Sequence, residues 1–200
     1  MPATHGDLFE TPLPRVGPPG LACAPDLITA PEEQSLLDRL ADIEVTPFRF
    51  QGWLGKRLTA SFGWRYDFDT ARFDPADPIP DFLLPLRERA AAFAGLAPEE
   101  LVQSLVVRYD PGAGIGWHRD RPLFEHVIGV SLEAPATLRL RRRRERGFDR
   151  AAPPLAPRSI YHLSGEARYG WEHSIAAMTA RRWSVTFRSL SAKGLAAVAR

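Results

Sequence analysis

Apolar positions before residue 100 recur at helical spacing in two stretches. Leucines three and four residues apart share one face over residues 30–41, and Thr29 followed by Glu32 has the form of a capping box at the start of this helix. A second series with the same spacing covers residues 81–94 and is followed by Gly95, a residue type that commonly ends a helix. The pattern therefore predicts two helices in the N-terminal half.

Beyond about residue 100 the pattern changes to short apolar runs, some of which alternate with polar residues. Leu138 and Leu140 would lie on one face of a strand, and Arg139 and Arg141 on the other. Glycines and prolines between the runs mark turns, which favours antiparallel sheets. The predicted strands are 101–109, 127–132, 137–141, 159–163, 173–176 and 183–190. Together these elements predict an α+β fold with a jelly-roll core backed by N-terminal helices.

The distribution of proline indicates how the chain is organised. Seven of the 19 prolines occur within the first 31 residues. Because proline fixes φ and lacks a backbone donor, we expect residues 1–20 to form an irregular arm. We expect a single domain over residues 21–190, in which 21–100 hold the helices and 101–190 the jelly-roll core. Residues 191–200 would form a C-terminal tail.

Composition limits the class of protein further. A hydrophobic content of 44% and a net charge of +2 at pH 7 are ordinary for a globular domain and exclude general disorder. Cys23 is the single cysteine and cannot form an intrachain disulfide. The sequence has no apolar run long enough to span a membrane, and residues 1–10 do not resemble a secretory signal. We expect a monomeric, cytoplasmic protein that makes no membrane contact.

A candidate metal site follows from the spacing of two histidines and an aspartate. His118 and Asp120 are two residues apart, so they can point to the same side of a strand, and His173 begins another predicted strand. Two histidines and one carboxylate form the facial triad of non-haem Fe(II) oxygenases, which leaves coordination positions open for a 2-oxo acid and O₂. The alternative is that the His-x-Asp spacing arose by chance, because this short pattern is common.

The last predicted strand carries two arginines on one face. With a period of two, Arg182, Ser184, Thr186 and Arg188 share a side of the strand. Two guanidinium groups on the inner side of a sheet would be costly unless an anion meets them, and a carboxylate suits the planar guanidinium. A dicarboxylate that chelates the metal at one end could present its far end here. The alternative is the solvated face of an edge strand.

In this combination the sequence resembles the AlkB family of Fe(II)- and 2-oxoglutarate-dependent dioxygenases. Three stretches carry the resemblance in order: 108–112 leading to 118–120, 164–168 leading to 171–175, and 182–188. The resemblance covers residues 100–190 well and the N-terminal half loosely. It implies a double-stranded β-helix, which is the jelly roll that the strand pattern predicts.

Carried over to this chain, the resemblance implies a set of site residues. The iron ligands would be His118, Asp120 and His173. The co-substrate would be bound by Tyr109, Arg182, Ser184 and Arg188. Of these, Arg182 would take the distal carboxylate of 2-oxoglutarate, and Arg188 would lie near its metal-chelating end and the substrate.

The resemblance also implies a substrate lid formed before the jelly roll. Aromatic and basic residues alternate there and could stack on a base and contact phosphate. The candidate substrate residues are Trp53, Arg57, Phe62, Tyr66 and Arg121. The alternative is an ordinary amphipathic hairpin that packs its aromatic residues on the core.

The chain departs from the DNA-repair members of the family at three places. Val107 and Ser184 stand where those members typically carry asparagine. Arg121 and Pro122 follow the metal aspartate, where those members often have an acidic residue that reads a methylated base. The last departure keeps a protein or small-molecule substrate open as an alternative.

A run of arginines lies between the two metal-binding segments. It consists of Arg139, Arg141, Arg142, Arg143, Arg144 and Arg146. Because the alternating strand ends at about Arg141, we expect the later arginines on a hairpin tip, where they could neutralise phosphates. The alternative is a solvated loop.

These features favour an Fe(II)- and 2-oxoglutarate-dependent dioxygenase that hydroxylates or oxidatively demethylates its substrate. The favoured substrate and partner is an N-alkylated base in DNA or RNA, as in alkylation repair. One alternative is the same chemistry on a protein or small molecule. Another is a catalytically silent jelly roll that binds nucleic acid.

Overall fold

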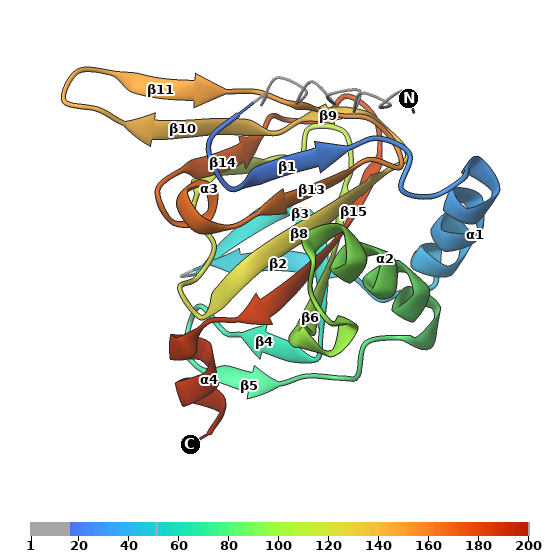
Figure 1. The fold of residues 1–200 in the computed structure, drawn as a ribbon. Helices are drawn as coiled ribbons and strands as arrows, with labels where there is room; N and C mark the ends of the chain where they lie inside the picture. The colour runs from blue at the N-terminus through green and yellow to red at the C-terminus, as the bar shows by residue number, and fades with distance from the viewer. Residues whose placement is uncertain (1–16, 51, 200) are drawn as a thin grey trace, which may run out of the picture.

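A computed structural model describes residues 17–50 and 52–199, so most of the predicted N-terminal arm lies outside the described residues. Two antiparallel sheets face one another, and two helices cover the outer side of the larger sheet (Figure 1). The helical elements are α1 (Ala30–Ala41), the 3-10 turn η1 (Asp81–Leu83), α2 (Leu84–Ala94), the 3-10 turn η2 (Pro98–Glu100), α3 (Gly165–Tyr169) and α4 (Ala192–Val198). None of the helices in the described part of the chain is both long and apolar enough to cross a membrane.

The larger sheet has seven strands in the order β1-β13-β8-β15-β6-β3-β2. Their bounds are β1 (Leu21–Ala24), β2 (Thr46–Phe50), β3 (Trp53–Phe62), β6 (Leu101–Tyr109), β8 (Phe124–Leu132), β13 (Ile160–Leu163) and β15 (Arg182–Leu190). β15 is central and pairs with β6 on one side and β8 on the other. Its face is therefore not that of a solvated edge strand, and the alternative reading of its arginines is wrong.

The smaller sheet has four strands in the order β11-β10-β14-β7. Its strands are β7 (Ile115–His118), β10 (Arg139–Arg143), β11 (Phe148–Ala151) and β14 (Glu172–Ile175). Two further two-stranded ribbons are formed by β9 (Ala136–Thr137) with β12 (Pro154–Leu155) and by β4 (Trp64–Tyr66) with β5 (Phe73–Pro75). A buried apolar cluster lies between the two sheets. The predicted helix-backed jelly roll is confirmed.

Helix α1 begins and ends as its sequence predicts. The side chain of Thr29 accepts from the backbone N–H of Glu32, whose carboxylate accepts from the backbone of Thr29. The second predicted helix, 81–94, consists of η1 followed by α2, and Gly95 ends it with φ 70° in the left-handed region.

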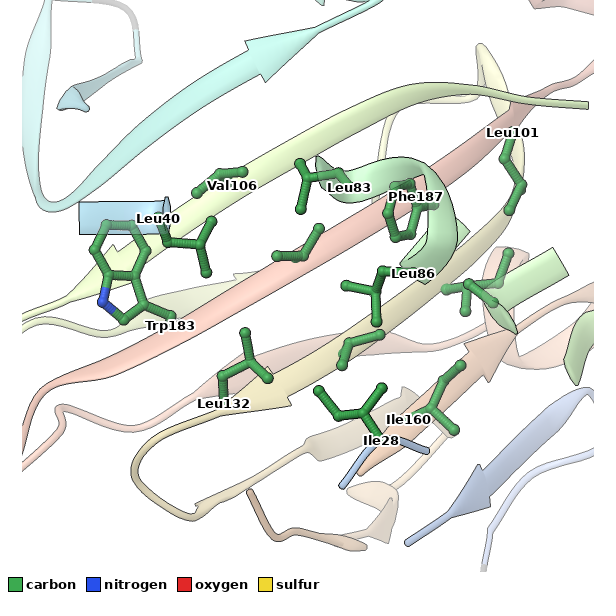
Figure 2. Close-up of a cluster of buried hydrophobic side chains, with 14 of the residues drawn as sticks. Ile28, Leu40, Leu83, Leu86, Leu101, Val106, Leu132, Ile160, Trp183 and Phe187 are labelled. Atoms are coloured by element: carbon green, nitrogen blue, oxygen red, sulfur yellow. The ribbon is translucent and has the colours of Figure 1, made fainter. Parts of the chain in front are cut away.

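The helices bury their apolar faces on the outer side of the larger sheet (Figure 2). Leu83 and Leu86 belong to the same buried cluster as Val185 and Phe187 of β15. Since Phe187 alternates with Thr186 and Arg188 along β15, the burial of one face directs the polar face between the sheets. Packing of the helices thus fixes which side of β15 carries the arginines.

Two details of the strand prediction are wrong. The predicted strand 137–141 is two elements, β9 and β10, and β10 continues to Arg143 because residues 140–143 pair with β11. Arg142 and Arg143 therefore lie in a strand and not on a hairpin tip. Residues after 100 also include the short helices α3 and α4, too short for a periodic signal; α4 occupies most of the predicted tail.

Candidate metal centre and co-substrate pocket

A cavity of ≈ 1650 Å³ opens between the two sheets. Its lining includes eleven of the twelve predicted metal, co-substrate and substrate residues: Arg57, Phe62, Tyr66, Tyr109, His118, Asp120, Arg121, His173, Arg182, Ser184 and Arg188. The twelfth, Trp53, begins β3, but its side chain lies outside the described part of the structure. The cavity thus brings together residues that lie far apart in the chain.

His118, Asp120 and His173 converge at one point of this cavity. Their potential ligand atoms all lie within 4.8 Å of one another. His118 ends β7 and pairs directly with His173 of β14, so their imidazole rings lie 4.2 Å apart between centroids. Asp120 follows β7 by two residues. Two imidazole nitrogens and one carboxylate oxygen are a donor set that suits Fe(II) and leaves positions open.

Each of the two imidazoles is poised to offer a lone pair. Nδ1 of His118 lies 2.9 Å from the carbonyl oxygen of Gly116, which only accepts, so Nδ1 carries the proton and Nε2 is the free ligand atom. Burial, reinforced by the nearby His118, lowers the pKa of His173 to about 3. His173 is therefore neutral at ordinary pH and able to bind a metal.

Arg188 orients the carboxylate of Asp120. Its Nε donates to Oδ2 of Asp120 at 3.2 Å, and its Nη1 donates to Oε1 of Gln103 at 2.8 Å. Burial favours the neutral acid, but Arg188 together with His173 and His118 outweighs it and holds the pKa of Asp120 below its ordinary value. The other oxygen, Oδ1, faces Nε2 of His118 at 3.7 Å. Asp120 therefore stays ionised with one oxygen free for a metal.

Arg182 has the one fully buried guanidinium among the described residues, at 1% exposure. Its Nε donates to Oγ of Ser131 at 3.1 Å, and its Nη1 is buried without a partner. Its guanidinium carbon lies 5.2 Å from the centre of the Tyr109 ring, which is opposite Arg182 on β6. A buried guanidinium nitrogen with no acceptor, in the wall of a cavity, fits a carboxylate ligand.

Tyr161 forms part of the cavity wall because Gly129 gives its ring space. The two residues are directly opposite on β13 and β8, and a Cβ on Gly129 would lie 2.3 Å from ring atoms of Tyr161. Burial raises the pKa of Tyr161 to about 12, so its phenol is neutral. The glycine therefore sets the ring position.

Gly129→Ala is expected to displace the Tyr161 ring and to destabilise the fold by about 1–3 kcal/mol, the usual cost of overpacking a core. Chemical denaturation measures this loss. The matched control is Gly129→Ala in a Tyr161→Leu background, where the clashing ring atoms are absent and the alanine should cost less stability than it does in the wild type. Equal stability of wild type and Gly129→Ala would show that the ring is not held there.

Helix α3 anchors the loop that carries Asp120. Arg168 is buried, and its Nη2 donates to the carbonyl oxygens of Arg121 and Phe124. Oγ of Ser191 donates to the carbonyl oxygen of Pro122 at 2.6 Å. These bonds hold the backbone just after the metal aspartate.

Three of the predicted lid residues, Arg57, Tyr66 and Arg121, line the cavity and take part in cation–aromatic pairs. The guanidinium of Arg57 lies 3.7 Å from the ring centre of Phe48, and that of Arg121 lies 4.0 Å from that of Tyr66. Burial lowers the pKa of Arg57, which stays cationic at neutral pH. Phe62 lines the cavity and also packs partly on the core cluster beneath the helices. The segment can therefore serve as a substrate lid and also pack aromatic residues on the core.

The arginine run does not line the cavity. Two of its members, Arg142 and Arg144, form ion pairs with Asp149, and Arg141 pairs with Glu172. The run is thus not uniformly free to contact phosphate, because three of its guanidinium groups already have a carboxylate partner.

Three further residues of the site, Gln103, Ser131 and Tyr161, were not predicted from the sequence. Gln103 could have been found by counting back from Tyr109 in steps of two along β6, since both face the cavity. Ser131 and Tyr161 give no such signal, because their positions depend on which strands pair.

Comparisons with known proteins agree with this site. The sequence profile of the 2OG-Fe(II) oxygenase superfamily matches residues 20–188. An Arabidopsis thaliana protein described as "Alkylated DNA repair protein ALKBH8 homolog" is 33% identical over 183 residues, covering 78% of this chain and 51% of that protein. The Xenopus tropicalis tRNA (carboxymethyluridine(34)-5-O)-methyltransferase alkbh8 is 29% identical over 175 residues, covering 84% of this chain and 26% of that protein. The chain spans about half or less of the length of these relatives.

Solved structures share the fold at low sequence identity. OsALKBH1 superposes with a TM-score of 0.70 at 15% identity, covering 86% of this chain and 97% of that one. A Pseudomonas putida prolyl-4-hydroxylase gives a TM-score of 0.57 at 16% identity, covering 86% and 93%. The chain belongs to the 2OG-Fe(II) oxygenase superfamily, and its relatives confirm the resemblance to the AlkB family.

Proposed function

We propose that this chain is an Fe(II)- and 2-oxoglutarate-dependent dioxygenase that oxidises an alkylated base in RNA or DNA. The observation that carries the proposal is the position of Arg182. Its unpartnered buried Nη1 and the His118, Asp120 and His173 cluster line one cavity. A dicarboxylate that chelated the metal at one end would present its other carboxylate to this guanidinium.

In this proposal the protein's residues hold and orient the reactants. His118, Asp120 and His173 hold the iron, and Arg182 binds the far carboxylate of 2-oxoglutarate. When bound, iron and 2-oxoglutarate supply the chemistry that uses O₂ to hydroxylate a substrate C–H bond with release of succinate and CO₂. Arg188 keeps Oδ1 of Asp120 turned to the metal position by binding Oδ2.

The substrate part of the proposal rests on two cation–aromatic pairs in the cavity lining and on the relatives. Arg57 on Phe48 and Arg121 on Tyr66 combine positive charge with flat rings, which suits a base attached to phosphate. The Arabidopsis relative is named for alkylated DNA repair and the Xenopus relative for a tRNA uridine. Hydroxylation of an N-methyl group would release formaldehyde and the unmodified base.

Succinate release is expected to rise when the purified chain, with Fe(II), 2-oxoglutarate and O₂, receives a single-stranded oligonucleotide that carries N-methylated bases. The methyl carbon would fit the cavity beside the metal position while the lid holds the base. Formaldehyde should appear in equal amount, and a matched unmethylated oligonucleotide is the control.

Other outcomes identify the alternatives. Stimulation by a peptide or small-molecule pool, but by no RNA or DNA, would contradict the nucleic-acid substrate and leave the oxygenase assignment in place. Absence of succinate under every condition, with oligonucleotide binding intact, would point to a catalytically silent binding module.

A further inference from the structure

The smaller sheet carries a set of basic and aromatic side chains on the side that faces away from the cavity. Leu140 of β10 is buried between the sheets, so the neighbours of Leu140 along β10 lie on the opposite face, since strand side chains alternate. Pairing with β11 places further residues beside them. Six side chains make up what we call the outer basic face: Trp117, Arg139, Arg141, Arg143, Phe148 and Arg150.

Guanidinium groups and rings alternate across this face. Arg141 lies between two rings, 4.4 Å from the centre of Trp117 and 4.8 Å from that of Phe148. Arg139 lies 5.2 Å from the centre of Trp117. Stacking on a ring holds a guanidinium in place while its N–H groups stay available for an anion.

On the opposite face of the β10–β11 hairpin, the arginines are already paired with carboxylates. Arg142 donates to both Asp149 and Glu166, and Arg144 donates to Asp149. Two arginines there meet two carboxylates. This face also lies toward α3, because Glu166 belongs to that helix.

The outer basic face keeps most of its charge. Arg141 pairs with Glu172 at 2.7 Å, but Arg139, Arg143 and Arg150 form no ion pair within residues 17–50 and 52–199. Arg143 and Arg150 are exposed, and their guanidinium carbons lie 5.2 and 5.4 Å from the centre of the Phe148 ring. Nε of Arg139 is buried without a partner. With four arginines and a single glutamate partner, the outer basic face favours binding of a polyanion.

We propose that the outer basic face binds a single-stranded nucleic acid, with arginines on its phosphates and Phe148 and Trp117 available to its bases. This inference rests on the proposed nucleic-acid substrate and adds a second contact region outside the cavity. Interleaved rings and guanidinium groups suit unpaired bases, whose faces are accessible, better than a duplex. Charge complementarity is the reason for choosing a polynucleotide as the occupant.

The outer basic face is continuous with the cavity through Trp117. Trp117 lines the cavity and is also stacked by Arg139 and Arg141. The β10–β11 hairpin extends beyond the body of the molecule (Figure 1). A strand bound on this face would therefore pass Trp117, the one residue that the outer basic face shares with the cavity lining.

The test is the salt dependence of binding by the full chain to a labelled oligouridylate of about 12 nucleotides, followed by fluorescence anisotropy. Arg143→Ser combined with Arg150→Ser should weaken binding about tenfold at low salt. The slope of log affinity against log salt should become shallower by up to about 1.4, since each lost phosphate contact on a single strand contributes about 0.7. Arg143→Lys with Arg150→Lys should keep the slope.

The matched control is Arg142→Ser with Arg144→Ser, which removes the same formal charge from the paired face and should leave the slope unchanged. Thermal unfolding of each variant checks that the hairpin is intact. Phe148→Leu should weaken binding to the oligouridylate at least about fivefold and should weaken binding to inorganic polyphosphate, which has no bases, distinctly less.

Three results would overturn the proposal. Equal losses in the two serine double variants would indicate a general charge effect. Unchanged slope in the Arg143 and Arg150 variant, with wild-type binding intact, would place the nucleic acid elsewhere and leave the proposed function standing. Absence of wild-type binding to RNA and DNA at low ionic strength would remove both this surface and the nucleic-acid substrate, whereas succinate release would still test the oxygenase.

Discussion

Asp120→Ala is expected to abolish Fe(II) binding and 2-oxoglutarate turnover while the fold is retained. Asp120 supplies the only carboxylate of a three-residue ligand set within the described residues. Its loss also leaves the buried Arg188 facing two imidazoles without a negative charge between them. The measurement is the iron content of the protein after anaerobic loading, together with succinate formation. His118→Ala should behave in the same way.

The matched control for this prediction is Arg119→Ala. Arg119 is the exposed neighbour between the two ligands, so its removal should leave iron stoichiometry normal. Near-normal iron content in Asp120→Ala or His118→Ala would contradict the ligand assignment. Loss of folding cooperativity in Asp120→Ala would be detected by thermal unfolding, and His118→Ala then provides the independent test.

Arg182→Ala is expected to weaken 2-oxoglutarate binding far more than iron binding. Loss of a charge-assisted pair in a buried site costs on the order of 2–5 kcal/mol, which is a factor of roughly 30 or more in affinity. The physical reason is that Nη1 of Arg182 has no protein partner and is free for a carboxylate. The measurement compares the 2-oxoglutarate concentration dependence with the Fe(II) affinity.

Two further variants test whether the guanidinium of Arg182 itself, and not the residues around it, binds 2-oxoglutarate. Arg182→Lys should restore 2-oxoglutarate binding only in part, because an ammonium is a point charge without the planar fork. Ser131→Ala removes only the acceptor of Nε and should have a smaller effect than Arg182→Ala. Unchanged 2-oxoglutarate affinity in Arg182→Ala would show that the co-substrate is anchored elsewhere.

Strand alternation was sufficient to predict much of the site. The shared polar face of β15, and the prediction that His118 and Asp120 point to one side, follow from a period of two, which requires no knowledge of strand partners. The direct pairing of His118 with His173 could not be derived in this way, because it depends on β14 lying next to β7 in the sheet. The family resemblance supplied that link.

Other parts depended on contacts that the sequence does not display. The contrast between Arg142, which is paired, and Arg143, which is free, arises from the register of β10 against β11 and from the position of α3. The close approach of Tyr161 to Gly129 likewise requires β13 to pair with β8. The monomeric state and the cytoplasmic location stay predictions.

Joint binding of Fe(II) and 2-oxoglutarate by the triad and Arg182 is tested most directly by anaerobic titration of 2-oxoglutarate into the full chain, with and without Fe(II), followed by calorimetry. No substrate is required, so the metal and co-substrate sites are tested alone. Stoichiometric binding is expected, strengthened by Fe(II) and lost in Arg182→Ala. Absence of 2-oxoglutarate binding, or equal affinity with and without the metal, would contradict a site in which the triad and Arg182 act together.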